Sequence, residues 1–195
     1  AFAAFQDIEY SWYKESIETL RDEWIISWYN ETEFGDENTL TRAEILKMLF
    51  KMSGKWTDAD GETPCFRDVK VSDWYHPFIC AAVAWNLIKG YDDDTFKPNN
   101  PVTTLEAIIL SNRFFGTMNT ASSSGLLNVS DKEMQAFTND NNIAATSSYN
   151  LDTKLSRGRA TEILLRMRAY ATKKSKLDYK SIGCSVSSSK LWSVN

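Results

Sequence analysis

The chain has 195 residues, of which 43% are hydrophobic and 13% aromatic, and its net charge is −4. This composition supports a packed core, since disordered chains are poor in apolar residues. The negative charge argues against nucleic-acid binding, and a single histidine argues against His-based catalysis or a zinc site. The apolar runs are too short for a membrane span. The chain opens with AFAAFQDI rather than Met, and we expect a mature or excised fragment.

A repeated unit begins near the N-terminus, and its first copy covers about residues 5–54. The copy reads FQDIEYSWYKESIETLRDEWIISWYNETEFGDENTLTRAEILKML. The amphipathic stretch after its first Trp-Tyr pair predicts a helix. Thr41 followed by Glu44 predicts a capping box at the start of a second helix. We therefore expect a helix–loop–helix unit.

The second copy covers about residues 66–116 and reads FRDVKVSDWYHPFICAAVAWNLIKGYDDDTFKPNNPVTTLEAIIL. Its first helix is predicted from Trp74 to Leu87, with Asp73 as the N-cap, and Thr103 begins the second helix. Thr41 and Thr103 lie 62 residues apart, which is also the spacing of the two Trp-Tyr pairs. Such agreement in order and spacing indicates a true repeat.

The loop GYDDDTFKPNN of the second copy has three interpretations: a metal loop, a phosphate loop or a connector between helices. The sequence contains no P-loop motif, which argues against the phosphate loop. Asp92, Asp93 and Asp94 are typical calcium ligands, but the alternating oxygens and closing Glu of an EF-hand are missing. The interpretation that we favour is a connector between two helices, with Phe96 filling the core. His76 is expected to be a surface residue at a helix start rather than a ligand.

The third copy covers about residues 125–170, lacks the Trp-Tyr pair, and has Ser156 at the start of its second helix. One helical hairpin cannot bury its own apolar face, but three can bury one another's. We expect an all-α domain over residues 1–170, with three helix–loop–helix copies in a pseudo-threefold, three-pronged spindle. Residues 171–195 are expected to be a basic, Ser-rich tail or linker.

Aromatic residues recur around each predicted first helix. Trp12 and Trp74 stand at its start in copies one and two, and we expect them to pack in the core. Trp28 and Tyr29 fall in the loop of copy one, where packing and the lining of a groove are both open.

Three cysteines are present, without a C-x-x-C pair. Cys65 directly precedes the second copy and Cys80 lies in its first predicted helix, so we expect a disulfide between them. Such a bond implies an oxidising, exported setting. The alternative is two buried free thiols, and Cys184 is the odd cysteine in either case.

The segments FRDV…DWY…LIKGYDDDTFKPNNPVT of copy two and LTRAEIL of copy one resemble the S-layer homology family. The resemblance extends from about Phe5 to Tyr170, and three copies are the usual number in that family. It implies a helical spindle with grooves between its prongs. It also implies attachment of exported proteins to bacterial cell-wall polymers, often polysaccharides with acidic groups such as pyruvate ketals.

The resemblance further implies a set of ligand-binding residues. In the family, the arginine of the T-R-A-E motif meets the acidic sugar, a loop glycine lets the ligand approach the backbone, and neighbouring aromatics line the groove. Carried over to this sequence, the set is Arg42, Arg157, Gly90, Tyr91, Trp28 and Tyr29. Arginine also suits this role chemically, because its planar guanidinium pairs with a carboxylate through two hydrogen bonds.

Several positions depart from the family pattern. The motif arginine is replaced by Thr104 in copy two, so that prong is expected to lack its cation. The loop glycine is replaced by Trp28 in copy one and Thr146 in copy three, and the motif glutamate by Arg159 in copy three. These departures leave two hypotheses for the function.

The leading hypothesis is a non-covalent anchor at the bacterial cell surface that binds an acidic wall polysaccharide. The alternative is a degenerate module that acts as a protein–protein or S-layer lattice element without binding sugar. Both hypotheses imply an extracellular protein that is not an enzyme and needs no cofactor or metal. Neither hypothesis includes a nucleic-acid partner. In the lattice-element hypothesis, the partners are other S-layer or surface proteins.

Overall fold

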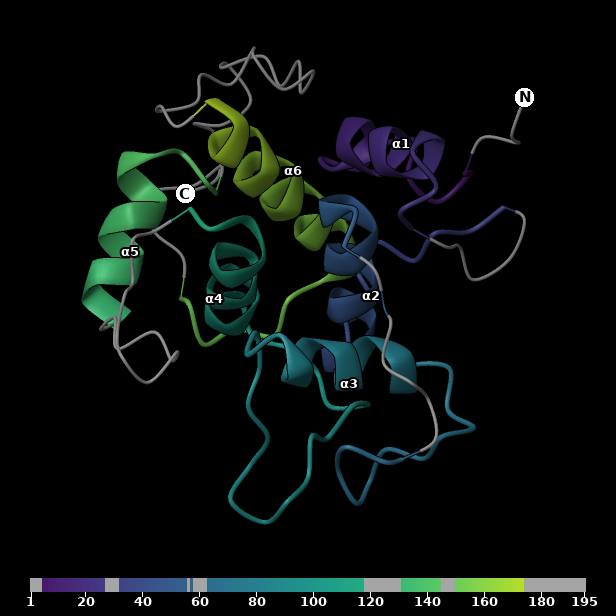
Figure 1. The fold of residues 1–195 in the computed structure, drawn as a ribbon. Helices are drawn as coiled ribbons and strands as arrows, with labels where there is room; N and C mark the ends of the chain where they lie inside the picture. Colours follow the sequence, from purple (N-terminus) through teal and green to yellow (C-terminus); the bar gives the residue numbers. More distant parts are fainter. Residues whose placement is uncertain are drawn as a thin grey trace.

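The computed structural model describes residues 5–26, 32–55, 57, 63–117, 131–144 and 150–173. Helices α1 to α6 span Lys14–Asp22, Arg42–Ser53, His76–Ala84, Thr104–Phe115, Asp131–Asp140 and Arg157–Lys173 (Figure 1). Within the described ranges, extended backbone pairs only at isolated bridges. The predicted all-α class is confirmed.

The second helix of each copy begins where the sequence predicts. Thr41 Oγ1 accepts a hydrogen bond from the backbone N–H of Glu44, whose carboxylate in turn accepts from the N–H of Thr41. Thr103 and Glu106 form the same capping box at α4, and Ser156 Oγ accepts from the backbone of α6. These bonds satisfy N–H groups that a helix start otherwise leaves without partners.

The first helix of copy two starts later than predicted. It begins at His76, and Asp73 does not cap it, because the Asp73 carboxylate accepts from the backbone N–H of Lys70 in the preceding turn. Pro77 then occupies the first turn, where proline is favoured because no hydrogen bond is lost there. The helix ends at Ala84, short of the predicted Leu87.

The two helices of one copy do not pack mainly on each other; the first helix of each copy packs on the second helix of another copy, an arrangement called crosswise packing below. Helices α2, α4 and α6, the second helices of the three copies, contact one another. Around them, α1 packs on α6, α3 packs on α2, and α5 packs on α4 (Figure 1). Each first helix therefore covers the second helix of another copy.

A closed ring of backbone hydrogen bonds joins the residues that stand just before the capping residues of these three helices. The N–H of Val102 donates to the carbonyl of Leu40 (2.9 Å), Leu155 to Val102 (2.9 Å) and Leu40 to Leu155 (2.8 Å). All three side chains are buried. The ring fixes the three helix starts beside one another. A three-pronged spindle around a pseudo-threefold axis stays a prediction.

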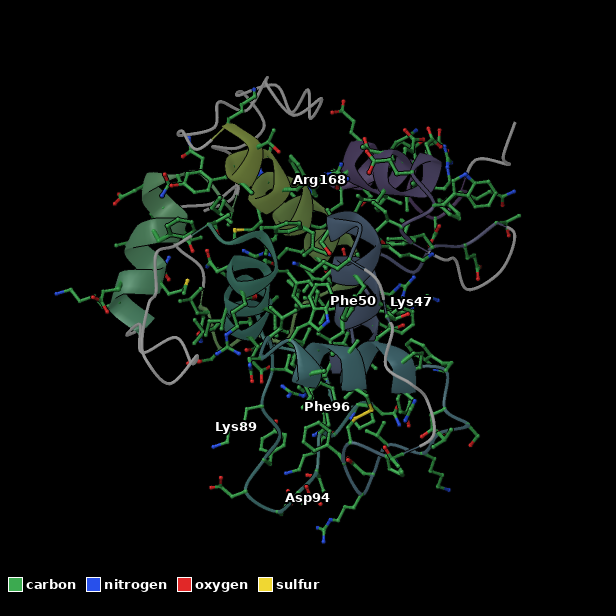
Figure 2. The ribbon with its side chains drawn as sticks, viewed as in Figure 1. Lys47, Phe50, Lys89, Asp94, Phe96 and Arg168 are labelled. Carbon is green, nitrogen blue, oxygen red and sulfur yellow. A yellow bond between two sulfur atoms is a disulfide. The ribbon has the colours of Figure 1, made fainter. Side chains whose placement is uncertain are left out.

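The apolar core draws on all three copies. Phe50 of α2 lies near its centre, with the ring centroids of Phe114 and Phe78 at 5.0 Å and 5.9 Å (Figure 2). Phe96 is 1% exposed, which confirms that the loop of copy two fills the core.

Three side chains differ from expectation. Trp12 and Trp74 are 55% and 50% exposed, so the prediction that they pack in the core is wrong. Each precedes its helix, and the next residue, Tyr13 or Tyr75, packs against the core instead. His76 is only 2% exposed and its Nε2 lies 3.1 Å from the carbonyl oxygen of Thr63. The surface position expected for His76 is therefore wrong, although it does start a helix.

Cys65 and Cys80 form the predicted disulfide, with their Cα atoms 5.4 Å apart. The alternative of two free thiols is thereby wrong. The bond ties the opening segment of copy two to α3. Trp28, Tyr29, Thr146, Cys184 and the tail from 174 to 195 lie outside the described residues. Among the described helices, none has the length and apolar character that a bilayer crossing requires.

Candidate functional site

A pocket of about 290 Å³ opens between α2 of copy one and the loop and second helix of copy two. Its lining includes three of the predicted site residues, Arg42, Gly90 and Tyr91. The remaining residues that matter for its chemistry are Lys89, Phe96, Glu106 and Arg113. The structure thus gathers these side chains from two different copies.

Arg42 lies at the centre of the contacts between the copies. Its Nη1 donates to Glu106 Oε1 at 2.7 Å and its Nε to the carbonyl oxygen of Phe96 at 3.1 Å. The guanidinium carbon stands 4.6 Å from the ring centroid of Phe96 and 5.2 Å from that of Tyr91. The Arg42 side chain is 12% exposed, and Nη2 has no hydrogen-bond partner among the described residues. Arg42 is therefore a largely buried cation with one edge left for other contacts.

The backbone explains why Arg42 faces the loop of another copy. Its N–H donates to the carbonyl of Asn100 at 3.0 Å, and the N–H of Ala43 donates to that of Pro98 at 3.0 Å. The first turn of α2 is thus joined to the loop of copy two. That copy carries Thr104 at its own motif position, and the arginine that faces its loop, Arg42, comes from copy one.

Glu106 has two roles. Its Oε2 accepts from the N–H of Thr103 at 2.9 Å, which completes the capping box, while its Oε1 pairs with Arg42. Capping of α4 and the contact between copies therefore depend on one carboxylate. A paired carboxylate also neutralises much of the Arg42 charge.

Gly90 is required by packing. A Cβ atom at this position would lie 2.1 Å from Cε1 of Phe66. The Phe66 ring stacks on Phe96, with centroids 5.7 Å apart and planes inclined by 26°. A side chain at Gly90 would push Phe66 and Phe96 out of place below Arg42.

Arg157 repeats the contacts of Arg42 between copies three and one. Its Nε donates to the carbonyl of Phe34 and its Nη1 to Glu44 Oε1, both at 3.1 Å. Its guanidinium carbon lies 4.7 Å from the Phe34 ring centroid. The predicted aromatics of this loop, Trp28 and Tyr29, lie outside the described residues. The Arg157 side chain is 9% exposed.

The third equivalent position lacks the arginine. The N–H of Thr104 donates to the carbonyl of Thr153 at 2.9 Å, the backbone contact that Arg42 makes to Asn100. Arg42 and Arg157 each pair with the motif glutamate of a neighbouring copy. The corresponding partner position for Thr104 is Arg159 of copy three, where the other copies have that glutamate. Both members of the Arg–Glu pair are therefore changed at this interface.

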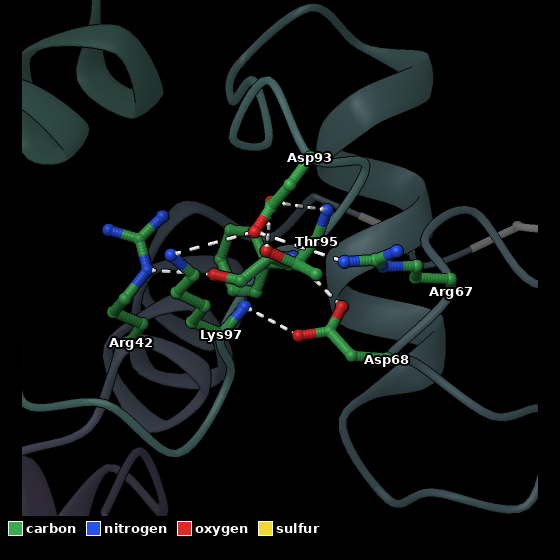
Figure 3. A network of polar contacts seen from close by, with 7 residues as sticks. Arg42, Arg67, Asp68, Asp93, Thr95 and Lys97 are labelled. Atoms are coloured by element: carbon green, nitrogen blue, oxygen red, sulfur yellow. Dashed lines mark hydrogen bonds and ion pairs between the residues drawn. The ribbon is translucent and has the colours of Figure 1, made fainter.

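The acidic loop is held by contacts within the protein (Figure 3). Asp93 accepts from the N–H and hydroxyl of Thr95 at 3.2 Å and 2.5 Å, and Lys97 Nζ lies 3.9 Å from its carboxylate. The hydrogen bond from Thr95 is the main reason that the pKa of Asp93 lies below its usual value. No cluster of three or more metal-type ligands occurs among the described residues.

Asp68 anchors this loop, a role that the sequence analysis did not assign. Its two carboxylate oxygens accept from the N–H groups of Phe96 and Lys97, each at 2.8 Å (Figure 3). Asp7 makes the same contacts to Phe34 and Gly35 in copy one. The signal was available, since Asp7 and Asp68 are the shared aspartates of F-x-D-[IV], 61 residues apart.

Residues 66–108 match the family model of the S-layer homology domain. The chain is 30% identical over 105 residues to the middle cell wall protein of Brevibacillus brevis, covering 53% of this chain and 10% of that protein. It is 34% identical over 112 residues to the exoglucanase XynX of Acetivibrio thermocellus, covering 57% of this chain and 10% of that protein.

A third relative is the cellulosome-anchoring protein of Acetivibrio thermocellus, 28% identical over 112 residues, covering 56% of this chain and 25% of that protein. The chain therefore matches a tenth to a quarter of the length of these relatives. The matched residues include the pocket-lining loop and the start of α4 with Glu106, and they end before Arg113. Copy two, at residues 66–108, is thus similar to an S-layer homology domain.

Proposed function

We propose that the chain anchors an exported protein to the bacterial cell wall by binding an acidic wall polysaccharide without a covalent bond. The observation that carries this proposal is the pocket between copies one and two, which combines cationic side chains with an exposed aromatic ring. The S-layer homology domain and the names of the relatives, among them a cell-wall protein and an anchoring protein, support the cell-wall setting.

The lining suits a sugar chain. Tyr91 is 41% exposed and offers a flat apolar face with a polar tip, which stacks well on a sugar ring. Arg42 offers Nη2 next to this ring. We propose Gly90 as the point of closest backbone approach and Arg157, Trp28 and Tyr29 as the corresponding residues of a second site.

We propose a binding module rather than an enzyme. Enzymes occur among the relatives, but the exoglucanase is matched over only 10% of its length. A shared segment of that size fits an attachment module better than a catalytic domain. We further propose that the three copies, up to the end of α6 at Lys173, form one such module, with the residues after it as a link to another part of the protein.

A lattice element without sugar binding is the second candidate. The observation that favours it is the strong internal pairing of the motif arginines, since Arg42 and Arg157 both hold a glutamate of the neighbouring copy. In that case, the arginines serve to join copies, and the exposed rings of Trp12 and Trp74 are surfaces for other proteins.

The test is a pull-down with purified cell-wall sacculi before and after their acidic polymers are stripped. We expect binding to intact sacculi and loss of binding to stripped ones. Arg42→Ala should weaken binding by roughly 1.5–3 kcal/mol, the value of a charged hydrogen bond, and Arg42→Lys by less, because charge remains but the planar fork is lost.

Arg42→Ala also frees the Glu106 carboxylate, which would repel an acidic ligand. Lys55→Met is the control, because Lys55 stands over the Trp85 ring and does not line the pocket. Circular dichroism verifies that each variant is folded. Equal binding of the parent to intact and stripped sacculi would favour the lattice element.

A further inference from the structure

Arg113 of α4 lines the same pocket and differs from Arg42 in its partners. Its Nη1 donates to the carbonyl of Leu87 at 3.0 Å, and its Nε is buried with no hydrogen-bond partner. Burial lowers the pKa of this guanidinium. Arg113 is nevertheless charged at neutral pH, since a shifted arginine remains a strong base.

The charges of the pocket do not balance. Arg42, Lys89 and Arg113 contribute three cations to the lining, whereas Glu106 is the carboxylate that lines it. Glu106 is paired with Arg42 at 2.7 Å. The uncompensated positive charge therefore lies at Arg113 and Lys89.

The equivalent residues in the other copies show which contact of Arg113 is structural. Lys51 of copy one resembles Arg113, because burial is the main cause that lowers its pKa and Lys47 stands one turn before it. Lys51 in copy one and Arg166 in copy three also donate to the backbone carbonyl after the first helix, at Trp24 and Asn142. Contact with that carbonyl is thus the shared structural role of the position. Arg166 has in addition a counter-ion within its own helix, because Glu162 Oε1 lies 2.9 Å from its Nη2.

Copy two has no such counter-ion in α4. The residue one turn before Arg113, at the position of Glu162, is Ile109, which itself lines the pocket. A partly desolvated cation without a carboxylate is costly unless an anion approaches it. The pocket opens at the place from which such an anion can come.

We propose that Arg113, assisted by Lys89, holds the acidic group of the ligand, whereas Arg42, neutralised by Glu106, contacts a neutral part of the sugar chain through Nη2. The proposal rests on the proposed function, and it specifies which end of the pocket recognises the acid. The ligand class is a saccharide with an anionic substituent, and the substituent is bound between α4 and the segment that holds Lys89 and Gly90.

The experiment compares two probes, the polysaccharide released from sacculi and the same polysaccharide after removal of its acidic substituents. The parent should prefer the acidic probe by about tenfold or more, as for a charged hydrogen bond. Arg113→Gln removes the charge but leaves an amide donor for the Leu87 carbonyl. We expect this variant to lose the preference and to bind both probes alike.

Two comparisons keep a folding defect apart from a binding defect. Arg113→Lys should restore part of the preference, and Lys51 shows that a lysine at this position still reaches the carbonyl. Lys55→Met removes a charge outside the pocket and should prefer the acidic probe as the parent does. In the parent, the NMR signal of the Arg113 Nε–H group should move with the acidic probe and stay in place with the stripped one.

A folded Arg113→Gln variant with the full preference of the parent would overturn the proposal. Should that variant not fold, an Arg113 Nε–H signal that is unmoved by a bound acidic probe overturns it equally. Failure of the proposed function looks different, because the parent itself would then bind neither probe. Binding lost in Arg42→Ala but a parent-like preference in Arg113→Gln would leave the anchor function standing and remove only the role of Arg113.

Discussion

At the scale of single residues, Gly90 tests whether packing or ligand access requires the glycine. Gly90→Ala places a Cβ atom where the Phe66 ring now lies, at 2.1 Å from Cε1. We expect the free energy of unfolding to fall by about 1–3 kcal/mol, as for other overpacked cores. Urea unfolding followed by circular dichroism measures the change. In a Phe66→Leu background the same substitution should cost less, and an undiminished cost would show that Phe66 is not the obstacle.

For the substitution Thr104→Arg, the sequence suggests a restored ligand-binding arginine, whereas the structure suggests a less stable protein. By sequence, Thr104→Arg restores a missing motif arginine. In the structure, Thr104 is fully buried and the residue in register with it is Arg159 rather than a glutamate. We therefore expect Thr104→Arg alone to destabilise the protein by about 1–3 kcal/mol.

Adding Arg159→Glu should recover part of that loss, since the pair then matches Arg42 with Glu106. A double-mutant cycle by urea unfolding gives the coupling, which we expect at about 0.5–3 kcal/mol in the stabilising direction. Strictly additive effects of the two changes would contradict the register inferred for this interface.

At the scale of elements, the capping boxes of α2 and α4 also connect neighbouring copies. Thr41→Ala removes only the cap of α2 and should cost about 0.5–2 kcal/mol of unfolding free energy. Glu44→Ala should cost more, because Glu44 accepts from Thr41 and pairs with Arg157 of copy three. Thermal or urea unfolding of both variants measures the difference. An equal cost for the two would mean that the pair with Arg157 adds nothing to stability.

The second helices could be predicted from the sequence because their start signals are local. A Thr or Ser cap, a Glu three residues later in two copies, and an apolar period act within one turn and need no distant partner. The disulfide was predictable for a similar reason, since Cys65 and Cys80 flank one short segment. The first helix of copy two was less predictable, because Asp73 has a competing turn in which to accept a hydrogen bond.

The arrangement of the site could not be predicted, since similarity between copies says nothing about which copies touch. Arg42, Gly90 and Tyr91 were each identified from the sequence, yet the pairing of Arg42 with the loop of copy two depends on the crosswise backbone contacts. The exposure of Trp12 and Trp74 was missed because a large apolar side chain next to a helix fits a core position equally well by composition.

At the scale of the whole molecule, the crosswise packing makes the first and last helices neighbours. Helix α1 packs on α6, and the hydroxyls of Ser16 and Thr161 lie 2.7 Å apart in the buried contact between them. Arg168 of α6 also pairs with Glu23 just after α1. Gly158 allows this approach, because a Cβ there would lie 2.6 Å from the Tyr13 ring. Copy one is therefore completed by a helix more than a hundred residues away in the chain.

This closure predicts how the protein responds to truncation. A chain ending at Thr117 keeps α1 to α4 but loses α6, the partner of α1. Helix α1 has only 9 residues, too few to be stable without packing. We expect its amides to exchange with solvent orders of magnitude faster in the truncated chain, whereas α3 keeps its partner α2 and should retain more protection. Hydrogen exchange measured by mass spectrometry compares the two helices within one sample. If α1 is protected as well as in the full chain, then copy one folds by itself and α1 does not need its contact with α6.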